Sequence, residues 1–362
     1  MNFHLSDEQV ALQDAVQRHA RESLDGGLRR AVFEGADGFD ASYWRGLMDM
    51  GVGGITIDEA HGGMGLGLVD LALVAEVLGY EAAPGPFLGH VLAARAIQAA
   101  GSAAQKARWL PLLARGQAVG TVALGEPGDR WAPSEWGLAL RQGRLSGTKS
   151  PVLYPALADV MVVGTEGGGL ALVEPKASTV TAEALDGVDR TRRLGAVRLD
   201  GVAAEPLGAG ALAAADLMDD SCVLLAADAF GGACRVLQMT VDYAKTRSQF
   251  GAAIGSFQGI KHRLANAACE VEPARGLYWY AALAQDQRQP DRSRIASLAK
   301  AHLADRFNAT ARTAVELHGG IGFTWEFDLQ IWVKRAMFDF SFAATPARHR
   351  QWAMQADAVA VA

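Results

Sequence analysis

Apolar residues recur at helical spacing in the first third of the chain, interrupted by glycine-rich breaks. Ser6 and Gln9 fit a capping box, in which each side chain satisfies a backbone N–H group at the start of a helix. This helix is predicted to run to Arg21. Further helices are expected at 41–50, 68–78 and 103–113, and a glycine-rich turn at 57–67. Residues 1–117 are therefore predicted to form an N-terminal helical domain.

The pattern changes between about Gly120 and Glu205, where short apolar runs alternate with Gly, Pro and Asp. No helical period is sustained there, and such runs are typical of an antiparallel sheet or a small barrel. The predicted strands lie at 121–124, 137–140, 144–148, 160–163, 170–173 and 196–199. We therefore predict a central β-domain over residues 118–208.

Helical spacing returns after Ala211 and continues to the end of the chain. Long helices are predicted at 216–245, 260–285, 292–318 and 346–359. Pro273 is expected to kink or shift the second of these helices, because proline cannot donate a helical hydrogen bond. Residues 209–362 are predicted to form a C-terminal helical bundle, so the fold class is mainly α with a central β-domain.

The composition narrows the classes of partner. The chain of 362 residues is too long for one hydrophobic core and carries a formal net charge of −6 without a basic block. An acidic chain of this kind is a poor candidate for binding nucleic acid or a membrane surface. No apolar run reaches about 18 residues without a charge, and no basic segment precedes an apolar core at the start. We therefore expect a cytoplasmic protein without a signal peptide.

The three cysteines, Cys222, Cys234 and Cys269, lie within or beside apolar segments. An odd number without C-x-x-C spacing argues against a disulfide framework or a zinc site, so no metal is expected. The thiols are expected to be buried and inert.

Residues 247–258 (RSQFGAAIGSFQ) combine a cation, two amides and two glycines at a predicted helix junction. A helix is expected to end near Arg247, and another to begin at Gln258. The guanidinium fork and free backbone N–H groups suit a diphosphate. Taken alone, the segment is better explained by a solvated arginine at a helix end.

Residues 316–324 (ELHGGIGFT) place three glycines directly after a predicted helix. A helix C-cap accounts for one glycine. Three glycines so close together indicate that another group lies against bare backbone.

In this order and on this architecture, the two segments resemble the acyl-CoA dehydrogenase family. Further matches extend the resemblance over nearly the whole chain: Glu59 with Gly62, Gly63 and Gly65; Gly125-Glu126-Pro127; Gly147-Thr148-Lys149; and Lys334-Arg335. The resemblance implies an N-terminal helical domain, a central β-domain and a C-terminal four-helix bundle. It also implies FAD as cofactor and assembly into dimers or tetramers.

In this family, the C-terminal bundle of one subunit contacts the adenine and diphosphate of the FAD held mainly by its neighbour. The residues that match these contacts are Arg247, Gln249, Phe250, Ile254 and Gln258, with Gly319, Gly320 and Gly322 in a second loop that approaches the cofactor. Glu316 stands where relatives commonly carry glutamine. A carboxylate beside a diphosphate would be repelled, so this contact departs from the family pattern.

The implied reaction is α,β-dehydrogenation of an acyl-CoA thioester, in which a carboxylate base removes the α-proton while a hydride leaves Cβ for the flavin. The stretch that usually carries this base falls on residues 342–345, and Ala343 occupies the base position. Other relatives place the base near Ser221. Its neighbours Asp219 and Asp220 are interpreted as carboxylates at a helix N-terminus, favoured by the helix dipole.

The segments expected to cover the flavin ring also differ from the family pattern. Gly125 replaces a threonine, residues 128–131 replace a glycine–serine stretch, and Pro151 and Leu153 stand in the ring-covering segment. The chain therefore keeps the distal FAD contacts and lacks the groups that face the ring.

Steroid-catabolic acyl-CoA dehydrogenases form α2β2 heterotetramers in which one kind of subunit supplies the base and ring pocket and the other supplies distal FAD contacts. This sequence resembles the second kind. The resemblance implies a base-bearing partner subunit, an acyl-CoA substrate and an electron-transfer flavoprotein as acceptor. Three alternatives remain open: a self-sufficient homo-oligomer using Asp219 or Asp220, a flavin monooxygenase or nitroalkane oxidase of the same fold, and a flavin-free scaffold.

Overall fold

The computed structural model describes residues 4–25, 27–208 and 210–360. Helices dominate the N-terminal part: α1 (Asp7–Leu24), α2 (Leu28–Glu34), α3 (Ala41–Asp49), α4 (Leu68–Tyr80), α5 (Phe87–Ala100) and α6 (Ala103–Ala114). The capping box of α1 is confirmed, because Ser6 Oγ accepts from Gln9 N at 3.2 Å and Gln9 Oε1 accepts from Ser6 N at 3.1 Å. Helices α2 and α5 were not predicted. Because α5 is buried on nearly all sides, its sequence is apolar all round and lacks the alternation of polar and apolar faces that marks a surface helix.

Two small sheets follow α6. Their strands are β1 (Gly120–Ala123), β2 (Arg144–Leu153), β3 (Val160–Thr165), β4 (Gly169–Val173), β5 (Val180–Leu185), β6 (Leu194–Ala203) and β7 (Glu205–Pro206). One sheet has the order β1-β3-β4-β7 and the other the order β2-β6-β5. The second sheet is antiparallel, as predicted, whereas the first is mixed, because β1 pairs with β3 in parallel.

The strand predicted at 137–140 is irregular. Gly137 N and Leu138 N donate to the carboxylate of Glu126 at 2.9 and 3.1 Å, so these N–H groups do not pair with a neighbouring strand. Residues 180–185, which form β5 at an exposed sheet edge, were not predicted as a strand.

The C-terminal part is a helical bundle. It contains α7 (Gly210–Thr246), the hairpin strands β8 (Ser248–Gln249) and β9 (Ala252–Ala253), and the helices α8 (Gln258–Val271), α9 (Arg275–Asp286), α10 (Arg292–His318), α11 (Leu329–Ser341) and α12 (Pro346–Ala360). Pro273 breaks the predicted 260–285 helix, because a 3-10 turn at Glu272–Ala274 separates α8 from α9. Helix α11 was not predicted.

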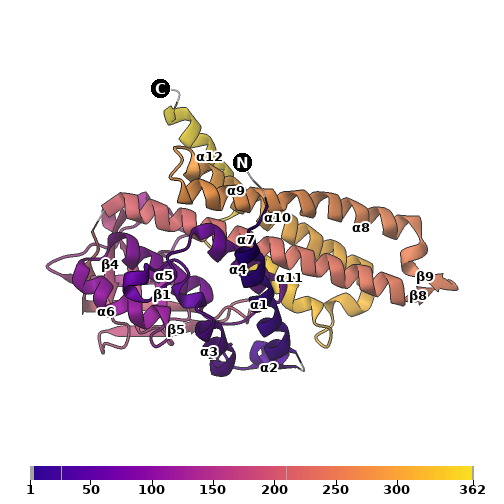
Figure 1. Cartoon of the computed structure of the whole chain (residues 1–362), viewed down its shortest axis with the longest axis horizontal. Coiled ribbons are helices and arrows are strands. Elements are labelled where there is room, and N and C mark those ends of the chain that lie inside the picture. Colours follow the sequence, from indigo (N-terminus) through magenta and orange to yellow (C-terminus); the bar gives the residue numbers. More distant parts are fainter. Residues whose placement is uncertain (1–3, 26, 209, 361–362) are drawn as a thin grey trace.

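Helix α7 is the longest helix described and extends along most of the length of the protein (Figure 1). It runs from the sheets to the β8–β9 hairpin at the opposite end (Figure 1), a length of about 55 Å at 1.5 Å per residue. It crosses α4 at backbone contact: a Cβ on Gly231 would lie 1.9 Å from the carbonyl oxygen of Glu76, and one on Gly79 would lie 2.1 Å from that of Asp228. Glycine on both helices is therefore what allows this close crossing.

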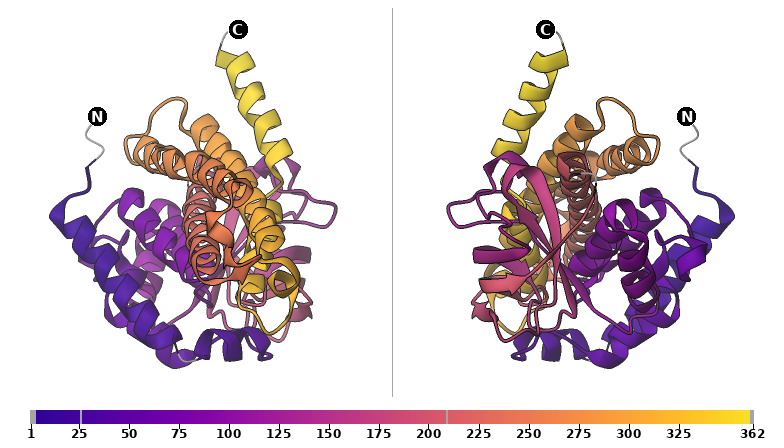
Figure 2. Two further views of the ribbon diagram at one scale, coloured as in Figure 1. Left: turned by 90° about the vertical axis from the view of Figure 1, so that its right-hand side faces the viewer. Right: turned by 90° about the vertical axis from the view of Figure 1, so that its left-hand side faces the viewer.

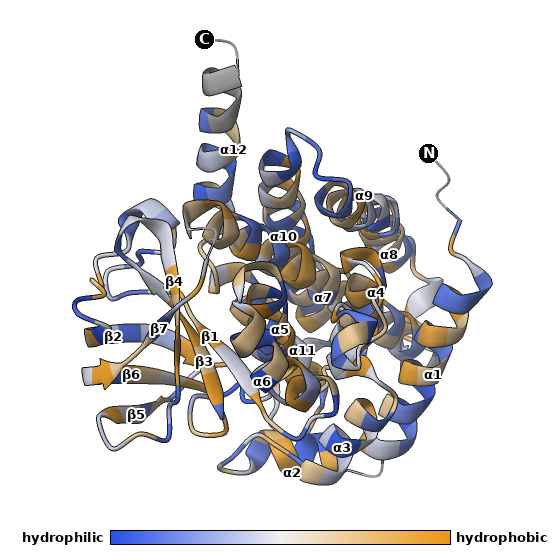
Figure 3. Cartoon of the chain, turned by 60° about the vertical axis from the view of Figure 1, so that its left-hand side comes forward, coloured by the Kyte–Doolittle hydropathy of each residue, from blue (hydrophilic) through white to orange (hydrophobic). Residues whose placement is uncertain are grey.

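By length and composition, α7 could span a membrane, but 72% of its most apolar window is buried inside the protein. This degree of burial is typical of a helix at the centre of a bundle, whose apolar residues pack against its neighbours. The N-terminal helices lie along one side of the bundle, and α12 projects from the body (Figure 2). Apolar residues gather where the helices and strands face one another (Figure 3).

Candidate cofactor-binding site and base position

The first predicted cofactor segment forms a hairpin at the tip of the bundle (Figure 1). Helix α7 ends at Thr246, the chain turns at Phe250 and Gly251 with φ of 52° and 78°, and α8 begins at Gln258. The carbonyl oxygen of Arg247 accepts from Ile254 N at 2.8 Å, which closes the base of the hairpin. The predicted helix–turn–helix junction is confirmed.

Three polar side chains of this segment are exposed and available to another molecule. Arg247, Gln249 and Gln258 are exposed, and within the described part of the chain their side chains make no hydrogen bond or ion pair. Phe250 is 95% exposed, and its ring lies edge-on to that of Phe257 at 6.3 Å between centroids. An unpaired guanidinium with two amides is a donor set that suits an anionic ligand.

The second predicted segment follows α10 as a short 3-10 turn, Gly319–Phe323. A Cβ on Gly322 would lie 2.7 Å from the carbonyl oxygen of Val315, so close packing accounts for this glycine. Gly319 has a φ of 66°, and a Cβ on Gly319 or Gly320 would meet open space. These two glycines leave bare backbone facing outward, which fits the predicted approach of a cofactor.

The structure brings the two segments to the same end of the bundle. The Tyr243 ring, on the last turns of α7, stacks on His318 at 4.3 Å, and its hydroxyl donates to the His318 carbonyl at 3.4 Å. Arg263 on α8 pairs with Glu316 on α10. The FAD contacts assigned to the eight residues of these segments remain a prediction.

The loop expected to carry the base, residues 342–345, is closed. Ala343 and Ala344 are 2% and 0% exposed, with φ of 56° and 77°, and neither side chain can accept a proton. The Ala343 carbonyl accepts from His349 Nε2 at 2.7 Å. This loop holds no carboxylate and is fixed through its backbone.

Trp131 fills the space between this loop and the end of β1. Its indole meets Phe342 edge-on at 5.1 Å between centroids, and a Cβ on Gly125 would lie 3.1 Å from its ring. The indole N–H donates to Asp129 at 2.8 Å. The segment in which the family pattern places small ring-facing residues is therefore occupied by a tryptophan that needs glycine beside it.

A buried ion pair fixes the loop that carries Trp131. Lys149 Nζ lies 2.7 Å from Glu126, and both side chains are almost fully buried. Burial lowers the pKa of Lys149 to about 8. Burial alone would raise the pKa of Glu126, but Lys149 and two backbone N–H groups lower it below its ordinary value. At the tip of the loop, Arg348 binds Asp129 and Glu135 and joins the loop to α12.

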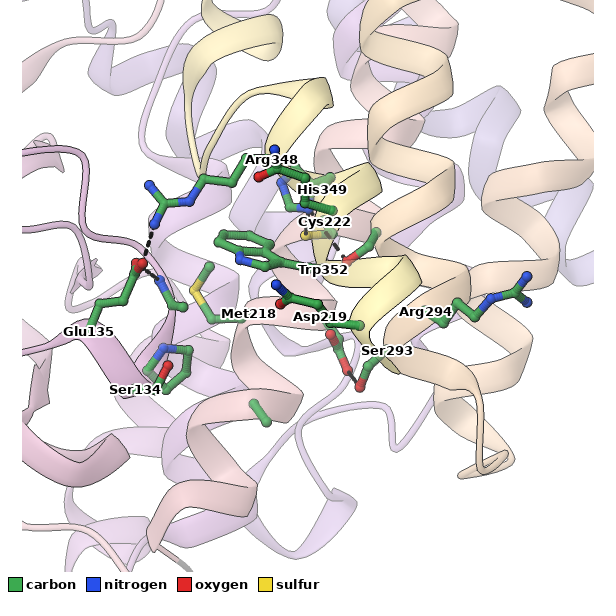
Figure 4. A pocket seen from close by; sticks show the side chains of 16 residues that line it. Ser134, Glu135, Met218, Asp219, Cys222, Ser293, Arg294, Arg348, His349 and Trp352 are labelled. Atoms are coloured by element: carbon green, nitrogen blue, oxygen red, sulfur yellow. Dashed lines mark hydrogen bonds and ion pairs between the residues drawn. The ribbon is translucent and has the colours of Figure 1, made fainter. Parts of the chain in front are cut away.

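A cavity of about 490 Å³ lies under this loop, between α7, α10 and α12 (Figure 4). Asp219 faces it and accepts a hydrogen bond from Ser293 Oγ at 2.5 Å. Burial raises the pKa of Asp219 to about 7. Asp220 instead pairs with Arg95 at 2.7 Å. Because α7 begins at Gly210, both carboxylates lie in its third turn, and their interpretation as helix N-terminal residues was wrong.

The floor of the cavity brings together Cys222, His349 and Ser297. The Cys222 sulfur lies 3.9 Å from His349 Nδ1. Burial raises the pKa of the Cys222 thiol and lowers that of His349 to about 3. Both groups are therefore neutral near pH 7, which argues against a thiolate nucleophile.

The three cysteines are free, as predicted. Only Cys222 is fully buried; Cys234 is half-buried and Cys269 is exposed on α8, so the expected burial was wrong for Cys269. Among the residues that the structure describes, no cluster of His, Cys, Asp or Glu could hold a metal ion.

Comparison with known proteins identifies the family. Residues 6–117 match the acyl-CoA dehydrogenase N-terminal domain, and residues 208–343 match the C-terminal domain. The chain is 33% identical to the acyl-CoA dehydrogenase IpdE2 of Mycolicibacterium smegmatis, over 92% of this chain and 93% of that protein. It is 32% identical to IpdE2 of Mycobacterium tuberculosis, over 91% of each.

Solved structures agree with this assignment. The Tcur3481-Tcur3483 steroid acyl-CoA dehydrogenase superposes with a TM-score of 0.92 at 29% identity, covering 98% of this chain and 99% of that one. The ChsE4-ChsE5 complex of Mycobacterium tuberculosis gives a TM-score of 0.90 at 28% identity, covering 99% of each chain.

The chain belongs to the acyl-CoA dehydrogenase family. The fold class and the resemblance predicted from the sequence are confirmed. Members of this family are FAD-dependent oxidoreductases that act on CH–CH bonds, so the predicted cofactor agrees with the family.

Proposed function

We propose that this chain is the subunit of a hetero-oligomeric acyl-CoA dehydrogenase that supplies contacts to the adenine and diphosphate of FAD, while a homologous partner supplies the base and the ring pocket. The observation that carries this proposal is an asymmetry within one chain. The distal segments around Arg247 are exposed and unpaired, whereas the loop around Ala343 is closed and lacks a carboxylate.

The closed side argues against dehydrogenation by this chain at the usual position. Removal of an α-proton needs a carboxylate or another base within hydrogen-bond reach of the substrate. Ala343 cannot take a proton, and Trp131 and Phe342 fill the neighbouring space. FAD supplies the hydride acceptor when it is bound, and this chain contributes no base there.

The open side supports a role in holding the cofactor. Arg247 offers a planar fork of donors, and the backbone at Gly319 and Gly320 is uncovered. A hetero-oligomeric partner is in keeping with the similarity to the ChsE4-ChsE5 complex.

The similarity to a steroid acyl-CoA dehydrogenase supports a proposal for the substrate. We propose an acyl-CoA thioester as substrate, with a steroid side-chain CoA ester favoured by the similarity to a steroid acyl-CoA dehydrogenase. We also propose an electron-transfer flavoprotein as the acceptor and the cytoplasm as the location.

Co-expression tests this function. The chain is purified alone and with a base-bearing homologous subunit, and the flavin spectrum, FAD stoichiometry and dehydrogenase activity are measured. We expect little FAD and little activity from the single chain, and both from the complex. In the complex, Arg247→Gln should weaken FAD binding roughly 10-fold or more, because a charge-assisted contact is lost.

Arg198→Gln, an exposed arginine on β6, is the matched control and should leave FAD affinity unchanged. Full activity of the purified single chain would overturn the proposal, and so would an Arg247→Gln complex that binds FAD like the wild type.

One observation favours a second candidate function, a self-sufficient dehydrogenase with a relocated base. Asp219 is a buried carboxyl that faces the 490 Å³ cavity with a pKa near 7, in the range suited to a general base. Asp219→Asn should abolish turnover by the single chain if this candidate holds. Asp220→Asn is the control, because Asp220 is paired with Arg95.

A further inference from the structure

Glu316 and Arg263 form an ion pair between α10 and α8. Glu316 lies in the last turn of α10, directly before the Gly319 turn, and Arg263 lies in the second turn of α8, beyond Gln258. Their side chains are 60% and 44% exposed, so both belong to the surface. The pair therefore stands beside both predicted cofactor segments.

The ion pair neutralises the negative charge of Glu316, which would otherwise oppose the binding of an anion. An unpaired carboxylate would repel an anionic diphosphate bound near the Gly319 turn, with an effect that reaches about 8–10 Å at physiological salt. Pairing with a guanidinium makes the unit neutral and leaves further N–H donors of Arg263 unused. A carboxylate is thereby tolerated at this end of the bundle.

We propose that Arg263 offsets the charge of Glu316 and so sets the affinity of this surface for the diphosphate of FAD. Arg263 then raises FAD affinity indirectly, by neutralising Glu316, whereas Arg247 donates to the diphosphate directly. This inference rests on the proposed function.

The chain contains a matched control pair. Arg306 on α10 and Glu270 on α8 bridge the same two helices, with side chains 30% and 55% exposed. Arg306 lies ten residues before Glu316, about 15 Å along the helix. Loss of either pair removes one α8–α10 link, but only one of them adjoins the cofactor segments.

The test uses the complex with the base-bearing subunit and measures the FAD dissociation constant by flavin fluorescence. Arg263→Gln leaves a free carboxylate and should weaken FAD binding roughly two- to fivefold. Glu316→Gln leaves a free cation and should tighten binding by a similar factor. The double variant and Arg263→Lys should bind within about twofold of the wild type, and all differences should shrink in 0.5 M salt.

Arg306→Gln and Glu270→Gln should leave FAD binding unchanged, and thermal melts of every variant verify folding. An Arg263→Gln complex that binds FAD like Arg306→Gln, or a double variant as weak as Arg263→Gln, overturns this inference alone when Arg247→Gln still weakens binding. A wild-type complex that binds no FAD, or one indifferent to Arg247→Gln, overturns the proposed function and this inference together.

Discussion

Arg335 on α11 and Asp228 on α7 form a two-contact ion pair in the interior, with N–O distances of 2.5 and 2.8 Å. Arg335 is 0% exposed and Asp228 is 2% exposed. Arg335 also donates to the Ala83 carbonyl at 2.9 Å and to Thr191 Oγ1 at 3.0 Å. One guanidinium therefore joins the N-terminal part, the loop before β6 and two helices of the bundle.

Asp228 also forms an ion pair with a second buried cation: its Oδ1 lies 2.7 Å from Nη2 of Arg192. Burial alone would raise the pKa of Asp228, but Arg192 and Arg335 lower it to about 2. The neighbouring Asp339 shows the opposite behaviour: burial and the charge of Asp228 raise its pKa well above the ordinary value. One carboxylate of this cluster is thus ionised and the other is neutral.

Replacement of Asp228 by asparagine should lower the free energy of unfolding by roughly 3–5 kcal/mol, because two buried guanidinium groups lose their carboxylate. Ionisation of Asp339 would offset part of this loss. Urea denaturation measures the effect. Asp242→Asn, on the exposed face of the same helix, is the control and should change stability by no more than about 0.5 kcal/mol.

Asp219 should make stability depend on pH in a defined window. Its pKa is about 7 in the folded protein against an ordinary value of 3.8, so the folded state holds a proton that the unfolded state releases. Its contribution therefore becomes unfavourable as pH rises from about 4 to 7. As pH rises from 4 to 8, the free energy of unfolding of Asp219→Asn should increase by roughly 2–4 kcal/mol relative to that of the wild type.

Denaturant titrations of the two proteins across this pH range provide the measurement. Asp220→Asn should be destabilised at both ends of the range, because Arg95 loses its partner. A constant difference between wild type and Asp219→Asn from pH 4 to pH 8 would show that Asp219 is not held neutral.

Local determinants of the fold were predictable from the sequence. Ser6 and Gln9 cap α1 through contacts three residues apart, Pro273 ends α8 because it lacks an N–H group, and the turn at Gly251 separates two helices. The backbone turns of the two predicted cofactor segments were also predictable, since each is a continuous run with its own glycine pattern; their FAD contacts stay a prediction.

Features that depend on distant contacts were not predictable. The partner of Asp220 is Arg95, 125 residues away, and the pairing of Arg263 with Glu316 spans 53 residues. The sequence does not tell which of Asp219 and Asp220 faces a cavity, because that depends on how α10 and α12 pack beside α7. The sequence marked 128–131 as unusual, yet the packing of Trp131 on Phe342 needed the fold.

Cysteine labelling should follow the order of exposure. Iodoacetamide at pH 8 should modify Cys269 in the native protein and leave Cys222 and Cys234 unmodified, because burial raises the pKa of both thiols, that of Cys234 to about 12. Mass spectrometry of peptides gives the sites. Cys269→Ser should remove native labelling, and rapid modification of Cys222 would mean that the floor of its cavity is accessible to the reagent.

Gly125 and Trp131 should be energetically coupled. A Cβ at Gly125 would lie 3.1 Å from the indole of Trp131 and 3.0 Å from the carbonyl oxygen of Ser150, so Gly125→Thr should cost about 1–3 kcal/mol through overpacking. Trp131→Ala should cost about 3–5 kcal/mol, since it leaves a cavity against Phe342.

In the double variant, the threonine side chain enters space that the indole has left, so the combined loss should fall short of the sum by at least about 0.5 kcal/mol. Unfolding free energies of the four proteins give this coupling. Trp44→Ala on α3 is the control, and its cost should add to that of Gly125→Thr. Additive costs for Gly125→Thr and Trp131→Ala would mean that Ser150 alone, and not the indole, requires glycine at position 125.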